Sequence, residues 1–248
     1  MKRIRFLFDC SFITPDNKLK GIPMYAIRLV EALPVDILVD CALLVHSSMV
    51  SLFKDTNQSF QLISVFQLKN KTNNKFIKHI NYFLYEAQIY SIKYECILIM
   101  DEHRKCTLFK TRNRKTCIIH DLKSINGPDA RKTFRFYDKL IKSSNDVIAI
   151  SQYTKGAIIK NYGTDENKIH VVYNSVSLPS QSVKPKKFDE TGNYILYVNT
   201  LLPYKNILTL IKAFEKTWER YNLRLVVVGQ STDYWESEIM AYVKAILS

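Results

Sequence analysis

The sequence lacks several features that would place it in a special class of protein. No stretch of about 18 residues is free of charged side chains, which argues against a strongly apolar transmembrane helix. The start, Met1-Lys2-Arg3, runs into a short strand pattern and not into the apolar core of a signal peptide. We therefore expect a cytoplasmic protein.

Cysteine is also scarce. The five cysteines are widely spaced, odd in number and form no Cys-x-x-Cys pair: Cys10, Cys41, Cys96, Cys106 and Cys117. This pattern favours buried reduced thiols over zinc ligands or disulfides. We expect no bound metal.

What the chain does contain is typical of a globular protein. Its 248 residues are 47% hydrophobic, which excludes disordered, collagen-like and disulfide-scaffold classes. The length suits one large domain or two modest ones.

The net charge of +13 is unevenly distributed, and about half of the excess lies between residues 69 and 115. One basic cluster leads into an apolar helical pattern with Phe76, Ile80, Phe83, Leu84 and Tyr85; its members are Lys69, Lys71, Lys75 and Lys78. The second cluster comprises Arg104, Lys105, Lys110, Arg112, Arg114 and Lys115. Basic residues beside exposed apolar ones suit an anionic membrane surface or a polyanionic acceptor. Nucleic acid is a second possibility, and simple solvation of the charges is a third.

Hydrophobic periodicity predicts alternating strands and helices over the first 178 residues. A strand over 4–8 is followed by a polar loop over 9–20 and by a helix that begins at Gly21 and ends at Pro34. Further strands are predicted over 37–45, 60–66, 95–100, 116–119 and 146–150, and further helices over 47–53, 73–92, 131–143 and 152–162. This alternation predicts a parallel α/β sheet, whose ligands usually bind at the carboxyl ends of the strands.

A polar, proline-containing linker over 179–192 separates this first domain from a second over 193–248. The second domain is predicted to contain a strand over 194–198, a helix from Asn206, a strand over 223–229 and a helix over 232–247. Ile207, Leu210, Ile211, Phe214 and Trp218 fall on one face of the first helix. Asn206 is a suitable helix cap, which places Lys205 beside a helix N-terminus, where an anion is favoured.

The order of residues around Lys205 resembles the donor-domain entry of family 4 glycosyltransferases. The segments that carry the resemblance are Asn199-Thr200-Leu201-Leu202-Pro203-Tyr204-Lys205-Asn206, Leu210-Ile211, Ala213-Phe214 and Val226-Val227-Val228-Gly229. The resemblance implies a GT-B fold of two Rossmann-like domains, a nucleotide-sugar donor and a retaining transfer that needs no metal or other cofactor. It also implies that Lys205 contacts the donor diphosphate, with Thr200 and Asn206 at the donor site. Asn199 stands where the family has glycine, and Tyr204 where it often has arginine.

The first domain shows the same resemblance at four places. Gly21-Ile22-Pro23-Met24-Tyr25 is similar to the family's glycine-rich loop, with proline in place of the second glycine. Cys117-Ile118-Ile119-His120-Asp121-Leu122 is similar to its strand followed by His-Asp-Leu, and this implies that His120 hydrogen-bonds the transferring sugar. The matches around Ser151 and Asn174 imply that both border the cleft, together with Gly21, Ile22, Tyr25 and Asp121. Ser151 is also predicted to cap the helix over 152–162.

The family's later donor-site motif, a glutamate followed by seven residues and a second glutamate, has no counterpart here. We therefore expect a complete acceptor-side domain and the first part of a donor domain, inactive alone or dependent on a partner that supplies the rest. The predicted activity is transfer of a sugar from a nucleotide diphosphate to a glycan or lipid-linked acceptor at the inner membrane face. A non-catalytic remnant or assembly module is the alternative. A basic nucleic-acid-binding protein is less favoured, because no recognition motif is present.

Overall fold

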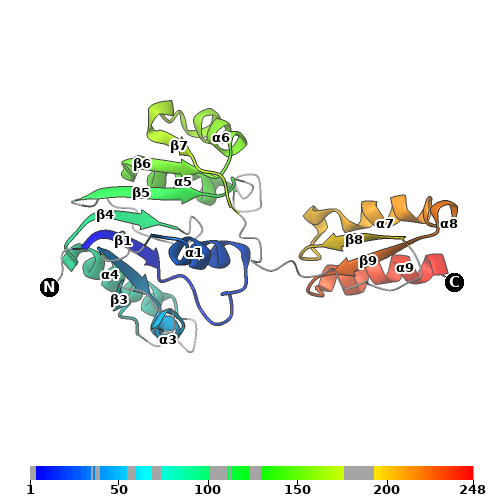
Figure 1. The fold of residues 1–248 in the computed structure, drawn as a ribbon, viewed down its shortest axis with the longest axis horizontal. Helices are drawn as coiled ribbons and strands as arrows, with labels where there is room; N and C mark the ends of the chain where they lie inside the picture. Colours follow the sequence, from blue (N-terminus) through cyan, green and yellow to red (C-terminus); the bar gives the residue numbers. More distant parts are fainter. Residues whose placement is uncertain are drawn as a thin grey trace. The chain divides into compact units, whose positions relative to one another are not determined.

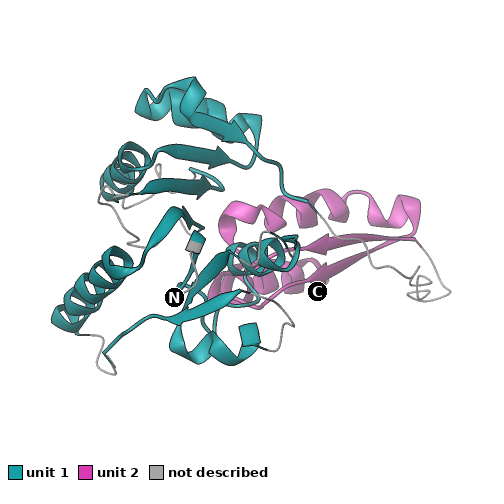
Figure 2. Cartoon of the chain, turned by 60° about the vertical axis from the view of Figure 1, so that its left-hand side comes forward, with its two compact units in different colours: residues 1–176 teal, residues 177–248 magenta. Residues whose placement is uncertain are grey.

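The computed structural model describes residues 4–34, 36, 40–54, 60–68, 74–100, 111, 113–122, 130–175 and 193–247. The chain forms two compact units, residues 1–176 and 177–248, which are coloured separately in Figure 2. The predicted linker over 179–192 lies outside the described residues. Each unit is described by itself below.

Unit 1 is built on a seven-stranded sheet with the order β3-β2-β1-β4-β5-β6-β7 (Figure 1). Its strands are β1 (Ile4–Cys10), β2 (Cys41–Val45), β3 (Gln61–Ser64), β4 (Tyr94–Ile99), β5 (Arg114–Ile119), β6 (Asp146–Ala149) and β7 (Ile169–Val171). All six pairings are parallel. The predicted parallel α/β class is confirmed.

Strand β1 is longer than its hydrophobic pattern predicts. Asp9 and Cys10 were assigned to a polar loop, but both belong to the strand, and Asp9 is paired in register with Leu44 of β2 and Ile99 of β4. The prediction failed because a carboxylate inside a central strand runs against the rule that buried charges are rare. Its hydrogen bonds, described below, explain why it is tolerated.

Helices cover both faces of this sheet. They are α1 (Gly21–Glu31), the 3-10 turn η1 (Ser47–Met49), α3 (Val50–Lys54), α4 (Lys75–Ser91), α5 (Ala130–Ser143) and α6 (Gln152–Tyr162). One core lies under α1, η1 and α3, and the other lies under α4, α5 and α6. Successive strand residues such as Ile118 and Ile119 enter opposite cores, as the pleat of a strand requires.

Two helix starts follow the capping rule. Asn74 accepts a hydrogen bond from the backbone N–H of Phe76 at 2.8 Å, and Ser151 Oγ accepts one from the N–H of Thr154 at 3.1 Å. The predicted cap at Ser151 is therefore confirmed. Gly163, with a φ of 59°, ends α6 in the left-handed conformation that glycine adopts without strain.

The strand order reverses at β1, which lies between β2 and β4. The chain builds outward through β2 and β3, and then returns to place β4 on the other side of β1. In open α/β sheets such a switch point, at the carboxyl ends of the strands, is where ligands usually bind.

Unit 2 contains the parallel pair β8 (Asn193–Val198) and β9 (Leu223–Val228). Its other elements are η4 (Pro203–Lys205), α7 (Ile207–Glu215), α8 (Trp218–Tyr221), the π-helical segment η5 (Trp235–Ile239) and α9 (Met240–Leu247). Ile207, Ile211 and Ile239 form the buried core over one face of the pair. Tyr242 Oη donates to Glu215 at 2.6 Å and joins α9 to α7.

The helix predicted from Asn206 through Trp218 is interrupted in the structure. Helix α7 ends at Glu215, and Trp218 begins the separate short helix α8. The Thr217 hydroxyl lies 3.2 Å from the backbone oxygens of both Ala213 and Phe214, where it satisfies the last carbonyls of α7. Placing Trp218 on the same helical face was therefore wrong.

The four described cysteines are reduced thiols that form no disulfide. Cys10, Cys41 and Cys117 are buried and Cys96 is half-buried, which agrees with the prediction of reduced internal thiols. Burial raises the pKa of the Cys10 thiol well above its ordinary value, and the neighbouring Asp9 carboxylate raises it further. Burial, with a smaller contribution from Asp40, raises the pKa of Cys41 to about 11.

These thiols predict a loss of stability in mild alkali. In the unfolded chain Cys41 ionises near pH ~8.5, whereas in the folded chain it stays protonated, so above that pH the folded state holds more protons. We expect the free energy of unfolding to fall by about 1 kcal/mol between about pH 8 and 9.5 from Cys41 alone. Urea denaturation at the two pH values tests this, with Cys41→Ala as the control that should remove about 1 kcal/mol of the pH dependence and leave the part due to Cys10. Equal stability of the wild type at both pH values would contradict it.

Candidate functional site

Two of the predicted site residues of unit 1 meet at the carboxyl end of β5. The rings of Tyr25, from α1, and His120, which follows β5, have centroids 4.7 Å apart and planes at 88°, an edge-to-face contact. Both side chains are half-buried, and burial raises the pKa of Tyr25. The fold thus brings the first helix and the histidine of the fifth strand together beside the switch point.

The backbone at His120 is held by the two helices that follow it in the chain. Thr154 Oγ1 donates to the carbonyl oxygen of His120 at 3.3 Å, and Ser151 Oγ lies 3.0 Å from Thr154 Oγ1. Tyr137 Oη, from α5, donates to the carbonyl oxygen of Asp121 at 3.2 Å. Ser151 therefore caps α6 and also contacts Thr154, which holds the backbone at His120.

A hydrogen-bonded cluster around Asp9, also at the carboxyl edge of the sheet, was missed by sequence reasoning. Asp9 is only 2% exposed, and its Oδ2 accepts a 2.6 Å hydrogen bond from Tyr85 Oη of α4. Its Oδ1 accepts from the Ser11 backbone N–H at 3.1 Å and from Ser11 Oγ at 2.5 Å. The sequence feature that could have revealed this cluster is a carboxylate, Asp9, directly after the apolar run Phe6-Leu7-Phe8. Tyr85 had been grouped with the exposed apolar residues, and this was wrong.

The structure also describes three other predicted residues of unit 1. Gly21 is the exposed first residue of α1, and a methyl group added to it would meet nothing within 4 Å. Ile22 packs against the core under α1. Asn174 is exposed and follows β7 by three residues.

The sequence predicts that the second basic cluster forms an exposed surface. Its two described members, Arg114 and Lys115, are instead engaged within unit 1. Arg114 makes two hydrogen bonds to Asp146, at 2.7 and 2.9 Å, which lower the pKa of that carboxyl. Lys115 is fully buried, with its Nζ 2.6 Å from Ser143 Oγ, so it cannot face a membrane as predicted. The position falls in a strand that is covered on both faces, and counting charges could not reveal this. The rest of this cluster, with Lys69 and Lys71, lies outside the described residues: Arg104, Lys105, Lys110 and Arg112.

The predicted donor residues of unit 2 lie between the carboxyl end of β8 and α7. Lys205 is half-buried in η4, with its Nζ 5.2 Å from the centre of the Tyr204 ring. Tyr197 Oη donates to the Lys205 carbonyl oxygen at 3.0 Å and so fixes this turn to β8. Thr200 is exposed, and its backbone N–H donates to Asn199 Oδ1 at 3.0 Å.

Asn206 precedes α7 but does not cap it in the predicted way. It adopts the left-handed conformation with a φ of 58°, and its Oδ1 accepts from Thr209 Oγ1 at 2.7 Å instead of from a backbone N–H. Asparagine is one of the few residues that tolerate this conformation. The first backbone N–H groups of an α-helix have no partner within the helix, so the start of α7 still suits an anion.

Gly229, just after β9, allows a close backbone approach. A β-carbon at this position would collide with the carbonyl oxygen of Asn199 and press on the side chain of Leu201. The Asn199 N–H donates to the carbonyl oxygen of Val228 at 3.1 Å and fixes that approach. Glycine is required at this position because the ends of β8 and β9 lie too close together for a side chain.

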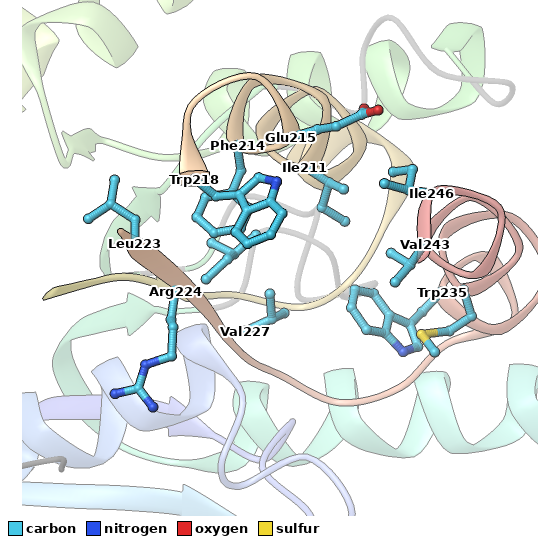
Figure 3. Close-up of a pocket in the computed structure, with 12 residues that line it drawn as sticks. Ile211, Phe214, Glu215, Trp218, Leu223, Arg224, Val227, Trp235, Val243 and Ile246 are labelled. Atoms are coloured by element: carbon cyan, nitrogen blue, oxygen red, sulfur yellow. The ribbon is translucent and has the colours of Figure 1, made fainter. Parts of the chain in front are cut away.

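Unit 2 also contains an apolar groove of about 620 Å³ (Figure 3). Trp218 of α8 and Trp235 lie on opposite sides of it, and Phe214, Leu223 and Val243 contribute to its walls. The lining residues come from α7, α8, β9, η5 and α9, and Thr200, Lys205 and Asn206 are not among them. The groove is therefore separate from the predicted donor residues.

Two features are absent from the described part of the chain. No group of three or more His, Cys, Asp or Glu side chains there could hold a metal ion. In the same residues, no helix combines the length and the apolar character needed to cross a membrane.

Two family models match adjoining parts of the chain and together cover more than half of it. Glycosyltransferase Family 4 matches residues 103–178, and Glycosyl transferases group 1 matches residues 180–243. The chain belongs to the family 4 glycosyltransferases. The parallel sheet of unit 1 agrees with the GT-B architecture of this family.

Two relatives of this glycosyltransferase chain are known by sequence. It is 35% identical over 142 residues to the O-antigen chain mannosyltransferase RfbU of Salmonella typhimurium, a match that covers 55% of this chain and 37% of the relative. It is 31% identical over 107 residues to an uncharacterized glycosyltransferase of Methanocaldococcus jannaschii, covering 38% of this chain and 27% of that protein. The chain thus spans well under half of each relative in these matches.

Solved glycosyltransferases share the fold. The Anabaena protein Alr3699/HepE, in complex with UDP and glucose, superposes with a TM-score of 0.64 at 15% identity, over 99% of this chain and 65% of that one. A glycosyltransferase from Rickettsia africae gives a TM-score of 0.60 at 17% identity, over 100% of this chain and 65% of that one. At such low identities these likenesses concern the fold alone.

Proposed function

We propose that the chain acts in a glycosyltransferase that moves a sugar from a nucleotide diphosphate to a glycan or lipid-linked acceptor in cell-surface polysaccharide synthesis. The observation that carries the proposal is the contact between Tyr25 and His120 beside the switch point of the sheet. The naming of one relative as an O-antigen chain mannosyltransferase supports the polysaccharide context. UDP in the structures of similar fold supports a nucleotide donor.

Each unit has a role in this proposal. In unit 1, His120 positions the transferring sugar, and Tyr25 packs against its ring and fixes its orientation. In unit 2, Lys205 and the N-terminal N–H groups of α7 counter the charge of the donor diphosphate. Thr200 and Asn206 flank the same turn.

The proposed transfer is retaining and needs no metal. The bond between the anomeric carbon and the diphosphate oxygen breaks, and the acceptor hydroxyl forms its new bond from the same face of the sugar. The hydroxyl proton leaves with the departing diphosphate. A fixed cation at Lys205 stabilises that leaving group at the moment its charge develops. We place the reaction in the cytoplasm, at the inner face of the membrane.

Nucleotide titration tests the donor side of the proposal. We expect UDP or GDP to bind the wild type, and Lys205→Ala to weaken that binding about tenfold to a hundredfold, because a charge-assisted hydrogen bond contributes about 1.5–3 kcal/mol. Isothermal titration calorimetry measures both. Lys216→Ala is the matched control, since this exposed lysine lies just after the opposite end of α7.

Unchanged affinity of Lys205→Ala for both nucleotides would remove Lys205 from the donor site. Absence of UDP and GDP binding by the wild type would overturn the donor role of unit 2. Nucleotide binding without transfer from radiolabelled UDP-glucose or GDP-mannose to a membrane lipid extract would favour an assembly module over an enzyme.

A further inference from the structure

Helix α4 is apolar on two opposite sides. Tyr85 and Ile89 are buried against the sheet. Phe76, Phe83 and Tyr90 are 72%, 70% and 64% exposed, respectively. These three residues are seven apart, which is close to two helical turns, so they form one stripe along the solvent side. Contiguous exposed apolar surface of this kind usually marks a site of protein–protein or membrane interaction.

The exposed stripe extends toward the carboxyl edge of the sheet. Tyr85 Oη bonds to Asp9, the second-last residue of β1, so the middle of α4 is level with the carboxyl end of that strand. Because α4 joins the end of β3 to the start of β4, it runs antiparallel to the strands. The ten residues before Tyr85 therefore extend about 15 Å toward the side where Tyr25 and His120 meet.

The segment after β3 is held against one flank of α4. The Gln88 side chain accepts from the Phe66 N–H at 3.0 Å and donates to the Ser64 carbonyl at 2.8 Å. The Asn81 side chain makes the same pair of bonds with the backbone of Leu68, at 2.7 and 3.0 Å. Both Phe66 and Leu68 are exposed, so further apolar surface is fixed beside the helix.

Three exposed lysines lie near the two ends of the stripe. Lys75 and Lys78 are exposed in the first turns of α4, and Lys93 is exposed just after its end. The only acidic residue within α4, Glu86, is half-buried. Aromatic side chains flanked by lysines fit the boundary between lipid headgroups and acyl chains, where cations are attracted to anionic headgroups.

We propose that Phe76, Phe83 and Tyr90, with Lys75 and Lys78, form a docking surface for an anionic lipid bilayer. A second copy of the chain fits it less well, because antiparallel pairing would bring Lys75 and Lys78 against Lys93, and parallel pairing would bring each lysine against itself. The inference deepens the proposed function, since it rests on a lipid-linked acceptor and brings its membrane to the carboxyl edge of unit 1.

Vesicle co-sedimentation of the whole chain tests the proposal. We expect strong binding to vesicles of equal parts phosphatidylcholine and phosphatidylglycerol, and at least tenfold weaker binding to phosphatidylcholine alone. The triple variant Phe76→Ser/Phe83→Ser/Tyr90→Ser should bind the anionic vesicles at least tenfold more weakly than the wild type. Lys75→Gln/Lys78→Gln should weaken binding severalfold and reduce its dependence on salt. The matched control is Tyr153→Ser/Lys160→Gln, which removes an exposed aromatic residue and an exposed lysine from α6.

A conservative variant covers the case in which the triple variant does not fold. Phe83→Trp keeps an aromatic ring at an exposed position, and its additional fluorescence should shift to shorter wavelength when anionic vesicles are added. Absence of that shift, or full binding by a folded triple variant, would overturn the proposal. So would sedimentation equilibrium showing a wild-type dimer that the triple variant converts to monomers. Nucleotide titration is independent of lipid, so failure of this proposal can be distinguished from failure of the proposed function.

Discussion

Replacing His120 by alanine is expected to slow sugar transfer by about two orders of magnitude, because a reacting group that is misplaced by about 1 Å can lose that much of its rate. Nucleotide affinity should stay within about twofold, because Lys205 and α7 are unchanged. The loss of rate is measured in a transfer assay with the sugar donor of whichever nucleotide binds in the titration. Nucleotide affinity is measured by calorimetry with UDP or GDP. His120→Asn, which retains hydrogen-bonding capacity, should recover part of the rate.

The matched control for this experiment is His170→Ala. His170 is exposed on β7, and its Nε2 lies 3.4 Å from Asp146 Oδ1, away from the contact between Tyr25 and His120. Its removal should leave transfer within about twofold of the wild type. If His120→Ala retained the wild-type rate, or if His170→Ala lost as much, the role proposed for His120 would be wrong.

Replacing Gly229 by alanine should unfold unit 2 while leaving unit 1 folded. The added methyl group would occupy the space of the Asn199 carbonyl oxygen, which the strand ladder holds in place. A forced overlap of this kind costs about 3 kcal/mol, and the small core of unit 2 has little stability to lose. Hydrogen exchange measures the two units separately, and exchange should accelerate over β8, α7 and β9.

Gly156→Ala provides the matched comparison for Gly229→Ala. Gly156 lies inside α6, and a methyl group there would meet nothing within 4 Å. Alanine should therefore stabilise unit 1 by about 0.5–1 kcal/mol through its higher helix propensity. Normal protection of unit 2 in Gly229→Ala would show that the strand ends can separate at little cost.

Sequence periodicity predicted the class of the fold and most of its elements. The runs around Leu7, Leu43 and Ile118 are apolar at every position, which is typical of strands covered on both faces, and they do lie in a parallel sheet. The predicted cap at Ser151 was also correct, because capping depends on local chemistry. The resemblance around His120 and Lys205 led to the family that the comparisons identify.

The predictions that failed depend on contacts between distant residues. Lys115 was counted as a surface charge, but β5 buries it and Ser143, 28 positions later, provides its partner. Asp9 was assigned to a loop because its partner Tyr85 lies 76 positions away. The contact between Tyr25 and His120 was equally invisible to periodicity, which describes faces but not which elements meet.

The central place of β1 in the sheet has a consequence for biosynthesis. Strand β1 pairs on one side with β2, but on the other with β4, about 90 positions downstream. Until Ile99 has emerged, Leu7 and its neighbours have only one strand beside them. Pairings of such long separation are slow to form and leave apolar edges open meanwhile. We therefore expect the nascent chain to need protection from aggregation from the synthesis of β1 to that of β4, and unit 1 to become resistant to protease only after β4 has been synthesised.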